Sequence, residues 1–268
     1  IIKDENPDLI ISVHPIVSII ISSIKKRSNL KFKYVNVVTD LITLFRGWGD
    51  QEADLTFAPT EGAFKVLTDF GIDPRKIEYS FFPINPKLEK TRVNEEILGE
   101  VNFNNNLPIV TITGGGVGTD SLKKAIKIIL KRRDLNLIVI CGKSEALRLE
   151  LVNKYKDEDN IYILGYVSNI QDYFQISDII ISKPGPATIL EIQLFNKKSI
   201  ITKPIGEQEK GNVDYALESK KFRYIGRNWE LLNRSLDELL TDATVENSSN
   251  RSFREAEMII EKALHLLD

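Results

Sequence analysis

The chain has 268 residues, enough for two domains of ordinary size that each bury a core. Apolar residues make up 42% of it and charged residues 28%, which is the balance of a globular protein and not of a disordered or fibrous one. The net charge of -2 lacks the basic excess of a protein that coats nucleic acid, so no nucleic-acid partner is expected. The single cysteine, Cys141, excludes an intrachain disulfide, and its place at the end of an apolar run predicts a buried thiol.

Short β-branched runs alternate with amphipathic segments of helical length along the whole chain, which predicts βα units and parallel sheets. The first group of predicted strands comprises residues 9–13, 33–38, 55–58 and 77–81. The second group comprises residues 109–113, 135–141, 161–164, 179–182, 199–202 and 222–225. The main predicted helices are 121–133, 145–156, 187–195, 212–219 and 245–267.

The segment 83–106 is polar and charged, with turn-forming residues at both ends, which indicates a linker between two domains. We therefore expect residues 1–95 to hold part of an N-terminal domain with the linker, and residues 96–268 to form a second domain. The second group of strands is a full set for a doubly wound domain, whereas the first group is too small. Because the chain also opens at Ile1 and not at Met, we expect the N-terminal domain to be incomplete.

The segment 15–24 is strongly apolar and is followed by Lys25, Lys26 and Arg27. One interpretation is an amphipathic surface helix whose basic flank docks on anionic lipid, giving a peripheral membrane contact. The other is a helix buried against the sheet. The basic cluster is expected to face lipid, and burial is the favoured expectation for four isoleucines: Ile16, Ile19, Ile20 and Ile24. The apolar run is about half of the roughly 20 residues that span a bilayer.

Polar residues end two predicted strands of the first part, in Val13-His14-Pro15 and Val38-Thr39-Asp40. Both groups fall at the carboxyl edge of the expected sheet, where α/β proteins bind ligands. Asp40 or His14 could therefore act as a general base. Helix capping is the alternative for each of them, and it is favoured for His14.

Thr113-Gly114-Gly115-Gly116-Val117-Gly118 follows a predicted strand and opens a helix. Glycines at such a place let backbone N–H groups approach a phosphate, and the helix N-terminus favours the negative charge. The spacing departs from the dinucleotide fingerprint, because Thr119 stands where its last glycine belongs. A P-loop is also excluded, because Leu137 replaces the first glycine needed before Gly142-Lys143-Ser144. A tight turn without a ligand is an equal alternative.

A second strand-to-helix junction lies at Ser182-Lys183-Pro184-Gly185-Pro186-Ala187-Thr188. Pro186 suits the first helical position and Gly185 suits the cap, so that Thr188 can donate its hydroxyl to a phosphate oxygen from the first turn. Glu191 shares a helix face with Thr188 and could accept both hydroxyls of a ribose. A capping box formed by Thr188 and Glu191 is less favoured, because Pro186 already starts the helix.

Two further motifs allow a chemical and a plain structural interpretation. Gln208 and Asn212 are spaced to present two amides on one helix face, which suits the hydroxyls of a hexose. Taken alone, a solvated helix start explains that motif better. Asp157-Glu158-Asp159 has the form of a metal-binding DxD, but it sits in a charge run at a helix end and indicates a surface loop, so no metal is expected.

Six motifs occur together in a fixed order and spacing. Four lie in the second part: Ile140-Cys141-Gly142-Lys143, Leu164-Gly165-Tyr166-Val167, Lys183-Pro184-Gly185-Pro186-Ala187-Thr188 with Glu191, and Gln208-Glu209-Lys210-Gly211-Asn212. Two lie in the first part: Val38-Thr39-Asp40 and Pro83-Ile84-Asn85-Pro86. Together they resemble the lipid-glycosylating GT-B enzymes, which include monogalactosyldiacylglycerol synthase, the bacterial diacylglycerol glucosyltransferases and, more distantly, the transferase that completes lipid II.

The resemblance implies an α/β GT-B fold with two Rossmann-like domains and parallel sheets, in which the C-terminal domain holds a UDP-sugar. It implies phosphate contacts from Gly115, Gly116, Gly185 and Thr188, and uracil contacts from Gly165 and Tyr166. It assigns the ribose to Glu191 and the hexose to Gln208 and Asn212, and it adds three residues to the donor-binding set: Lys183, Pro186 and Glu209. The UDP-sugar is a substrate, and no cofactor is implied.

The resemblance also implies an inverting hexosyltransferase of glycolipid biosynthesis, for example a galactosyltransferase, that acts on a membrane lipid such as diacylglycerol. Such an enzyme is cytoplasmic and peripheral to the inner face of the membrane. The family usually has Pro-Gly where Gly206-Glu207 stand, which leaves the sugar open. The family's glycine-rich loop with its candidate base histidine lies upstream of the residues present here, so that the chain, if it is a fragment, could bind UDP and still be inactive. Two alternatives are a sugar-nucleotide epimerase of the same fold and a nucleotide-sugar-binding subunit that needs a partner chain.

Overall fold

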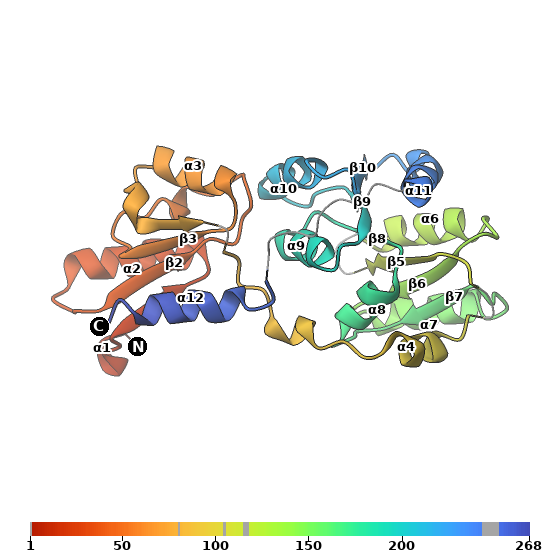
Figure 1. Ribbon diagram of the computed structural model, residues 1–268, viewed down its shortest axis with the longest axis horizontal. Helices are drawn as coiled ribbons and strands as arrows, with labels where there is room; N and C mark the ends of the chain where they lie inside the picture. The colour runs from red at the N-terminus through yellow and green to blue at the C-terminus, as the bar shows by residue number, and fades with distance from the viewer. Residues whose placement is uncertain (1, 80, 104–105, 115–117, 243–251) are drawn as a thin grey trace. The chain divides into compact units, whose positions relative to one another are not determined.

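The computed structural model describes the chain except for residues 1, 80, 104–105, 115–117 and 243–251. The chain divides into two compact units. The first unit contains residues 1–87, 207–215 and 251–268, and the second contains residues 88–206 and 216–250. Each unit is built around one parallel sheet, so the predicted α/β class with two parallel sheets is confirmed (Figure 1). All ten predicted strands are present, with ends that differ by at most two residues.

The first sheet has four parallel strands in chain order: β1 (Leu9–Ser12), β2 (Lys33–Val37), β3 (Leu55–Ala58) and β4 (Ile77–Tyr79). Its two faces are covered by helices from opposite ends of the chain. On one face α2 (Pro15–Arg27) packs through Ile21 on Tyr34, and α3 (Glu61–Asp69) packs beside it. On the other face α12 (Glu255–Leu264) packs through Ile259 and Ala263 on alternate residues of β2 and β3 (Figure 1). A parallel sheet covered on both faces explains why every residue of β2 after Lys33 is buried.

Short elements complete the first unit. They are α1 (Ile2–Glu5), η1 (Arg46–Trp48), η2 (Pro74–Lys76) and the start of η3 (Pro86–Glu89). The predicted last helix, 245–267, is observed as α12 from Glu255, and residues 243–251 lie outside the described part. The Glu255 carboxylate accepts a hydrogen bond from the backbone N–H of Phe82 at 2.8 Å, which ties the start of α12 to the chain that follows β4.

The orientation of α2 corrects the prediction that its isoleucines are buried. Ile16, Ile19 and Ile20 are each about half exposed, and of the four only Ile24 packs into the core beside Ile21. The cause is Ser18, which is fully buried and whose hydroxyl donates to Asn36 Oδ1 of β2 at 2.9 Å. This bond fixes which face of the helix meets the sheet. Because α2 is apolar nearly all round, its remaining isoleucines are turned outward.

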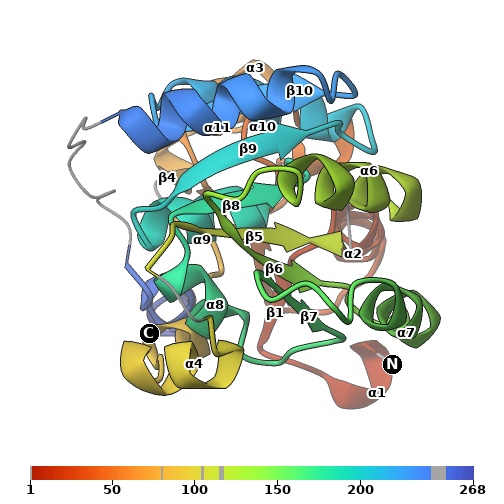
Figure 2. The ribbon, with the colours of Figure 1, turned by 90° about the vertical axis from the view of Figure 1, so that its right-hand side faces the viewer.

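The second sheet has six parallel strands in the order β10-β9-β8-β5-β6-β7 (Figure 2). Their bounds are β5 (Ile109–Thr113), β6 (Asn136–Ile140), β7 (Ile161–Leu164), β8 (Ile179–Ser182), β9 (Lys198–Thr202) and β10 (Phe222–Gly226). On one face the core is formed with α6 (Thr119–Ile129), α7 (Glu145–Lys154) and α11 (Leu231–Thr241). On the other face lie α4 (Asn94–Val101) and α8 (Ile170–Ile176). Along the chain α9 (Pro186–Leu194) follows β8, and α10 (Gln208–Leu217) follows β9.

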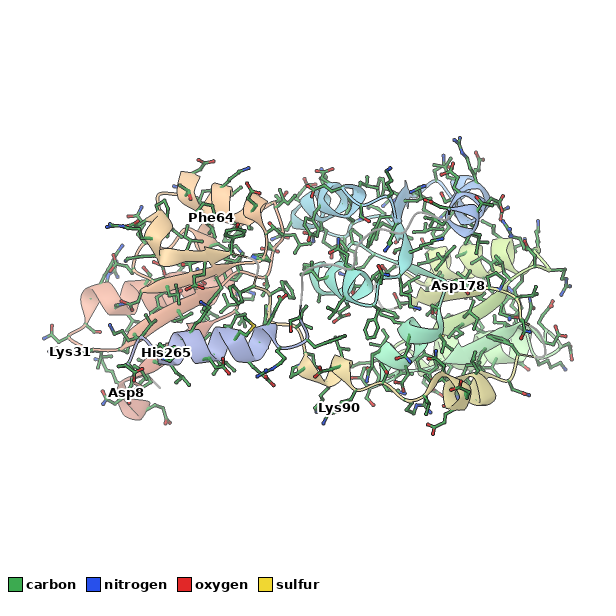
Figure 3. The ribbon with its side chains drawn as sticks, viewed as in Figure 1. Asp8, Lys31, Phe64, Lys90, Asp178 and His265 are labelled. Atoms are coloured by element: carbon green, nitrogen blue, oxygen red, sulfur yellow. The ribbon has the colours of Figure 1, made fainter. Side chains whose placement is uncertain are left out.

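The strand order reverses between β5 and β8. β5 is followed along the chain by its neighbour β6, whereas β8 lies on its other side and leads to β9. At the amino end of this pair the Asp178 carboxylate accepts from the backbone N–H of Ile109 at 2.7 Å, and the Asp178 N–H donates back to the Ile109 carbonyl at 2.8 Å (Asp178 is labelled in Figure 3). The opposite, carboxyl edge at such a switch point is where open α/β sheets bind ligands.

The predicted linker 83–106 contains a helix that belongs to the second unit. α4 buries Ile97 and Val101 against the sheet, and the predicted domain boundary at residues 95 and 96 falls in its first turn. Just before α4, Arg92 forms an ion pair with the buried carboxylate of Asp172 in α8 at 2.7 Å. Within the described residues no helix has the length and apolar character needed to cross a membrane.

Candidate functional site

A pocket of about 350 Å³ lies at the carboxyl edge of the second sheet. Its walls come from the ends of β5, β6 and β8, the loop after β7, and the first turns of α8 and α9. The lining residues are Thr113, Ile140, Gly142, Lys143, Tyr166, Val167, Ile170, Ser182, Lys183 and Thr188. The volume lies within the ~300–1,000 Å³ of pockets that hold small molecules. The pocket therefore combines a suitable size with the switch-point position.

The junction between β8 and α9 supplies the polar end of the pocket. The helix begins at Pro186 after Gly185, as predicted, and in the described part of the chain no side chain caps it. Thr188 therefore does not act as the N-cap, which removes the capping-box interpretation. The Lys183 Nζ and the Thr188 Oγ1 each lie 3.6 Å from the point where a Cβ on Gly185 would stand. An ammonium, a hydroxyl and a helix N-terminus gathered around a glycine suit a phosphate group.

The loop after β7 supplies the aromatic end of the pocket. Tyr166 is 68% exposed, and the Lys143 Nζ lies 6.0 Å from the centroid of its ring. Gly165 lies against Arg148, because a Cβ on this glycine would stand 3.2 Å from the Arg148 Cδ. Val167 completes an apolar wall. A flat aromatic ring above apolar side chains suits a planar base.

Glu191 lies on α9 and is half-buried. Burial raises the pKa of its carboxyl group above the ordinary value. Among the described residues no hydrogen bond or ion pair reaches this carboxylate, although burying an unpartnered acid costs free energy. It is not among the residues that line the pocket, but it lies one turn from Thr188, which does. A carboxylate kept without a partner at this place has the acceptor oxygens that a pair of ribose hydroxyls needs.

The remaining predicted donor residues do not lie in the unit that contains the pocket, or lie outside the described part. Gly115 and Gly116 fall in the segment 115–117, which is not described. Gln208, Glu209 and Asn212 begin α10, and residues 207–215 group with the first unit. Asn212 is 1% exposed, and its Oδ1 accepts a hydrogen bond from the backbone N–H of Leu41 at 3.4 Å, whereas Gln208 is exposed.

The two candidate bases of the first unit differ in their contacts. His14 caps α2: its Nδ1 accepts a hydrogen bond from the Ile16 N–H at 3.3 Å, which confirms the capping prediction. Asp40 follows β2, is half-buried, and accepts a hydrogen bond from Trp48 Nε1 at 2.7 Å. Burial raises the pKa of the Asp40 carboxyl group, an effect that the Trp48 bond and the nearby His14 partly offset. A carboxylate with a raised pKa is suited to take a proton near neutral pH.

A buried polar network fixes the position of Asp40. The Ser18 hydroxyl of α2 lies 3.0 Å from the Ser12 hydroxyl and 2.9 Å from Asn36 Oδ1. The Asn36 amide donates to the Trp48 carbonyl at 3.2 Å, and Trp48 in turn holds Asp40. Trp48 is fully buried, so this indole cannot turn away without opening the core. One continuous network thus connects α2, β2 and the candidate base.

Two other candidate groups of the second unit, Cys141 and the sequence Asp157-Glu158-Asp159, do not line the pocket. Cys141 is 4% exposed within the core, and burial raises the pKa of its thiol to about 11, so the predicted core thiol is confirmed. Glu158 of the DxD sequence forms an ion pair with Arg133 at 2.9 Å. In the described ranges no group of three or more His, Cys, Asp or Glu residues could hold a metal ion.

Sequence reasoning quoted Lys143 and Ser182 within motifs but assigned neither a role, and it did not single out Ile170. Lys143 and Tyr166 lie close together because β6 and β7 are neighbours in the sheet. The local sequence around either residue does not show that these two strands pair. Ile170 opens α8 without a motif of its own. For Ser182, the available signal was its position at the end of a predicted central strand, where ligand groups gather.

Comparison with known proteins assigns both parts of the chain. Residues 1–84 match the family described as monogalactosyldiacylglycerol (MGDG) synthase, and residues 109–265 match the glycosyltransferase family 28 C-terminal domain. The chain is 30% identical over 218 residues to the processive diacylglycerol beta-glucosyltransferase of Bacillus cereus (strain AH187), and equally to that of Bacillus anthracis (strain CDC 684 / NRRL 3495). The aligned region is 80% of this chain and 55% of each relative, so the chain spans about half the length of the curated relatives it matches.

Solved structures with a GT-B-like fold resemble the chain, and two of them contain UDP. The Staphylococcus aureus MnaA–UDP co-structure has a TM-score of 0.74 at 17% identity, over 99% of this chain and 78% of that one. The Methanocaldococcus jannaschii UDP-GlcNAc 2-epimerase in complex with UDP-GlcNAc and UDP has a TM-score of 0.70 at 18% identity, over 98% and 77%. At these identities the likeness shows the fold alone. The family 28 match, by contrast, covers more than half of the sequence, and the chain therefore belongs to glycosyltransferase family 28.

Proposed function

We propose that this chain carries the donor site of an inverting transferase that moves a hexose from a UDP-sugar to a membrane lipid of the diacylglycerol type. The observation that carries the proposal is the pocket at the carboxyl edge of the second sheet, which lies within the family 28 match. Its polar end, around Lys183, Gly185 and Thr188, suits the diphosphate, and its aromatic end at Tyr166 suits the uracil. Glu191 is the group for the ribose. The assignment of Gln208 and Asn212 to the hexose stays a prediction, because both residues belong to the first unit and Asn212 is buried there.

In the proposed transfer the oxygen of the acceptor hydroxyl attacks C1 of the sugar from the side opposite the diphosphate. Its proton passes to a base, the bond between C1 and the diphosphate oxygen breaks, and UDP leaves with the electron pair. Asp40 is the residue of the first unit with the properties of the base, because burial raises its pKa and Trp48 fixes its position. Lys183 and the N-terminus of α9 stabilise the charge that develops on the leaving diphosphate.

The lipid acceptor is supported by the exposed apolar face of α2, which comprises Ile16, Val17, Ile19 and Ile20 together with the exposed Phe45. Basic side chains flank this face: Arg46 follows Phe45, and the helix ends in Arg27 and in Lys26, which is exposed although it pairs with Glu52 at 3.4 Å. Apolar side chains with cationic neighbours fit the surface of an anionic bilayer. Lys25 does not belong to this contact, because it is mostly buried and forms an ion pair with Asp54 at 2.5 Å. The apolar residues, and not the basic cluster as a whole, are the main lipid-facing group.

Transfer from radiolabelled UDP-glucose or UDP-galactose to diacylglycerol in anionic vesicles tests the proposal. We expect a glycolipid product whose formation needs diacylglycerol. The double variant Ile16→Ser with Ile20→Ser should lower transfer into vesicles and leave UDP binding unchanged, because both side chains are on the exposed face. If this double variant self-associates less than the wild type but still binds vesicles equally well in a flotation assay, the face contacts a second copy of the chain and not the bilayer.

The same assay separates the alternatives. An epimerase of the same fold would convert the nucleotide-sugar in the absence of any lipid, which magnetic resonance of the sugar detects. A binding subunit would bind UDP and give no turnover until its partner chain is added. Failure of the chain to bind UDP would contradict the proposal in every form.

A further inference from the structure

One buried hydroxyl at the pocket has no hydrogen bond to the described part of the protein. Ser182 ends β8 and is 1% exposed, and its Oγ has no hydrogen-bond partner among the residues that the structure describes. Buried polar groups in native proteins are nearly always bonded, so each exception needs an explanation. Ser182 is also one of the residues that line the pocket.

The other buried hydroxyls on or beside the central strands of this sheet are bonded. The Ser199 Oγ of β9 donates to the Ile180 carbonyl at 2.8 Å, and the Thr202 Oγ1 donates to the Ser182 carbonyl at 3.1 Å. The Ser177 Oγ donates to the Tyr173 carbonyl at 2.6 Å and lies 2.6 Å from the Thr111 Oγ1. Acceptors are therefore available to hydroxyl groups in this sheet, and the lack of a hydrogen bond at the Ser182 hydroxyl results from the position of this residue.

That place is the switch point of the sheet. Ser182 ends β8 and Thr113 ends β5, the two strands between which the order reverses. The next residue, Lys183, places its Nζ 3.6 Å from the position of a Cβ on Gly185, and the Thr188 Oγ1 lies 3.6 Å from the same position. Ser182, Lys183 and Thr188 all line the pocket, and the described residues include no side-chain cap for α9, which starts beside them. An anion with several acceptor oxygens suits such a group of donors.

We propose that the Ser182 hydroxyl is a binding group for the diphosphate of the donor nucleotide, left without a protein partner so that it can donate to a phosphate oxygen. The proposal rests on the function proposed above and adds a residue to its donor site. A hydroxyl bonded to its own sheet would have to break that bond before it could bind the ligand. An unbonded hydroxyl costs free energy only in the empty protein, and that cost disappears when the phosphate binds.

This role makes a double prediction for Ser182→Ala. Removal of an unbonded hydroxyl takes away a buried polar group without breaking a bond, so the melting temperature should stay the same or rise. Affinity for UDP should fall roughly 10-fold to 100-fold, the scale of a hydrogen bond to a charged group. Ser199→Ala is the matched control, because it is equally buried on the neighbouring strand but bonded. It should lower the melting temperature and leave the affinity for UDP unchanged.

The experiment measures thermal unfolding of the wild-type chain and the two variants, and their binding of UDP and uridine by displacement of a fluorescent UDP analogue. Loss of UDP affinity in Ser182→Ala with unchanged uridine affinity is the expected result. Equal losses for UDP and uridine would assign Ser182 to the nucleoside and overturn the proposal, as would unchanged UDP affinity. Absence of UDP binding by the wild-type chain would instead overturn the proposed function itself, and the Ser182 role with it.

Discussion

The junction between β1 and α2 and the junction between β8 and α9 follow one plan, a half-buried or buried strand followed by a polar turn and a helix that begins at proline. They differ in what the polar groups contact. At the first junction His14 caps the helix, and nearby Asp40 is bonded to Trp48. At the second, the described residues include no side-chain cap for α9, no hydrogen-bond partner for the Ser182 hydroxyl, and no hydrogen bond or ion pair to the Glu191 carboxylate. The first junction is satisfied by its own chain, whereas the second has bonding groups available to a ligand.

The same contrast extends to the two helices. α9 buries Ile189, Leu190 and Ile192 completely, so its outer surface is free for polar groups of the site. α2 turns Ser18 inward and leaves isoleucines exposed. The start of α9, which is proposed to bind the donor, is thus held by apolar packing, whereas α2 is held by polar bonds and leaves apolar side chains exposed. Three substitutions probe this comparison.

The largest effect is expected at Asp40, the bonded residue that nevertheless has the properties of a base. Asp40→Asn keeps an oxygen that accepts from Trp48 Nε1 but removes the proton acceptor, so turnover should fall about 10²–10⁴-fold. Because the folded protein raises the pKa of Asp40, the charged form is disfavoured in the fold, and the penalty is present at neutral pH and is relieved as pH falls through the raised pKa. The variant should therefore be as stable as the wild type at pH 7, or more stable.

Steady-state transfer assays and thermal melts check this prediction. Asp73→Asn is the control, because Asp73 is a surface carboxylate of the same unit that pairs with Arg75 at 2.6 Å. Full activity in Asp40→Asn would show that Asp40 only positions Trp48, and both polar groups of the first junction would then be structural.

The second effect concerns Glu191, the partnerless acid of the second junction. Glu191→Gln should weaken UDP binding about 5-fold to 150-fold, the equivalent of about 1–3 kcal/mol for the loss of a charged acceptor. Because burial raises the pKa of Glu191, acidification should protonate it at a higher pH than an exposed glutamate and weaken UDP binding of the wild type there. The variant should lose this pH dependence.

Calorimetric titration with UDP between neutral and mildly acidic pH measures both quantities. Glu150→Gln is the control, because Glu150 is exposed on α7 and forms an ion pair with Lys123. An affinity that is unchanged in folded Glu191→Gln would remove this residue from the donor site and leave the burial of its carboxylate unexplained.

The strands and the α9 junction were predictable because they depend on local chemistry. Runs that contain β-branched or aromatic residues, set between turn formers, predicted the ten strands, and proline after glycine predicted where α9 begins. The outward face of α2 was not predictable in this way. Its sequence is apolar on nearly every side, so periodicity cannot select a face, and a single bond from Ser18 to Asn36 on another element decides it.

The pocket illustrates the same limit. Glycines and lysines next to strand ends pointed to the polar end, whose local geometry depends on consecutive residues. The contact between Lys143 and Tyr166 depends on the order of strands in the sheet. The lack of a hydrogen bond at the Ser182 hydroxyl depends on where the neighbouring carbonyl groups lie. Such properties become visible only when the partners of each group are known in three dimensions.

The smallest effect, and the one that tests the first junction most directly, is expected at His14. His14→Ala removes the side chain that accepts from the Ile16 N–H, so the free energy of unfolding should fall by about 1 kcal/mol, the usual value of an N-cap. His14→Asn should recover most of this loss, because the asparagine side chain is also a strong N-cap. His265→Ala changes the other histidine of the chain, which is exposed just after α12 and is labelled in Figure 3, and should have almost no effect.

Denaturant unfolding measures all three variants, and transfer assays on the same samples separate the two roles of His14. If His14 only caps α2, His14→Asn retains both stability and turnover. A stable His14→Asn with strongly reduced turnover would make His14 a participant in proton transfer, and the contrast between a satisfied first junction and an open second junction would no longer hold.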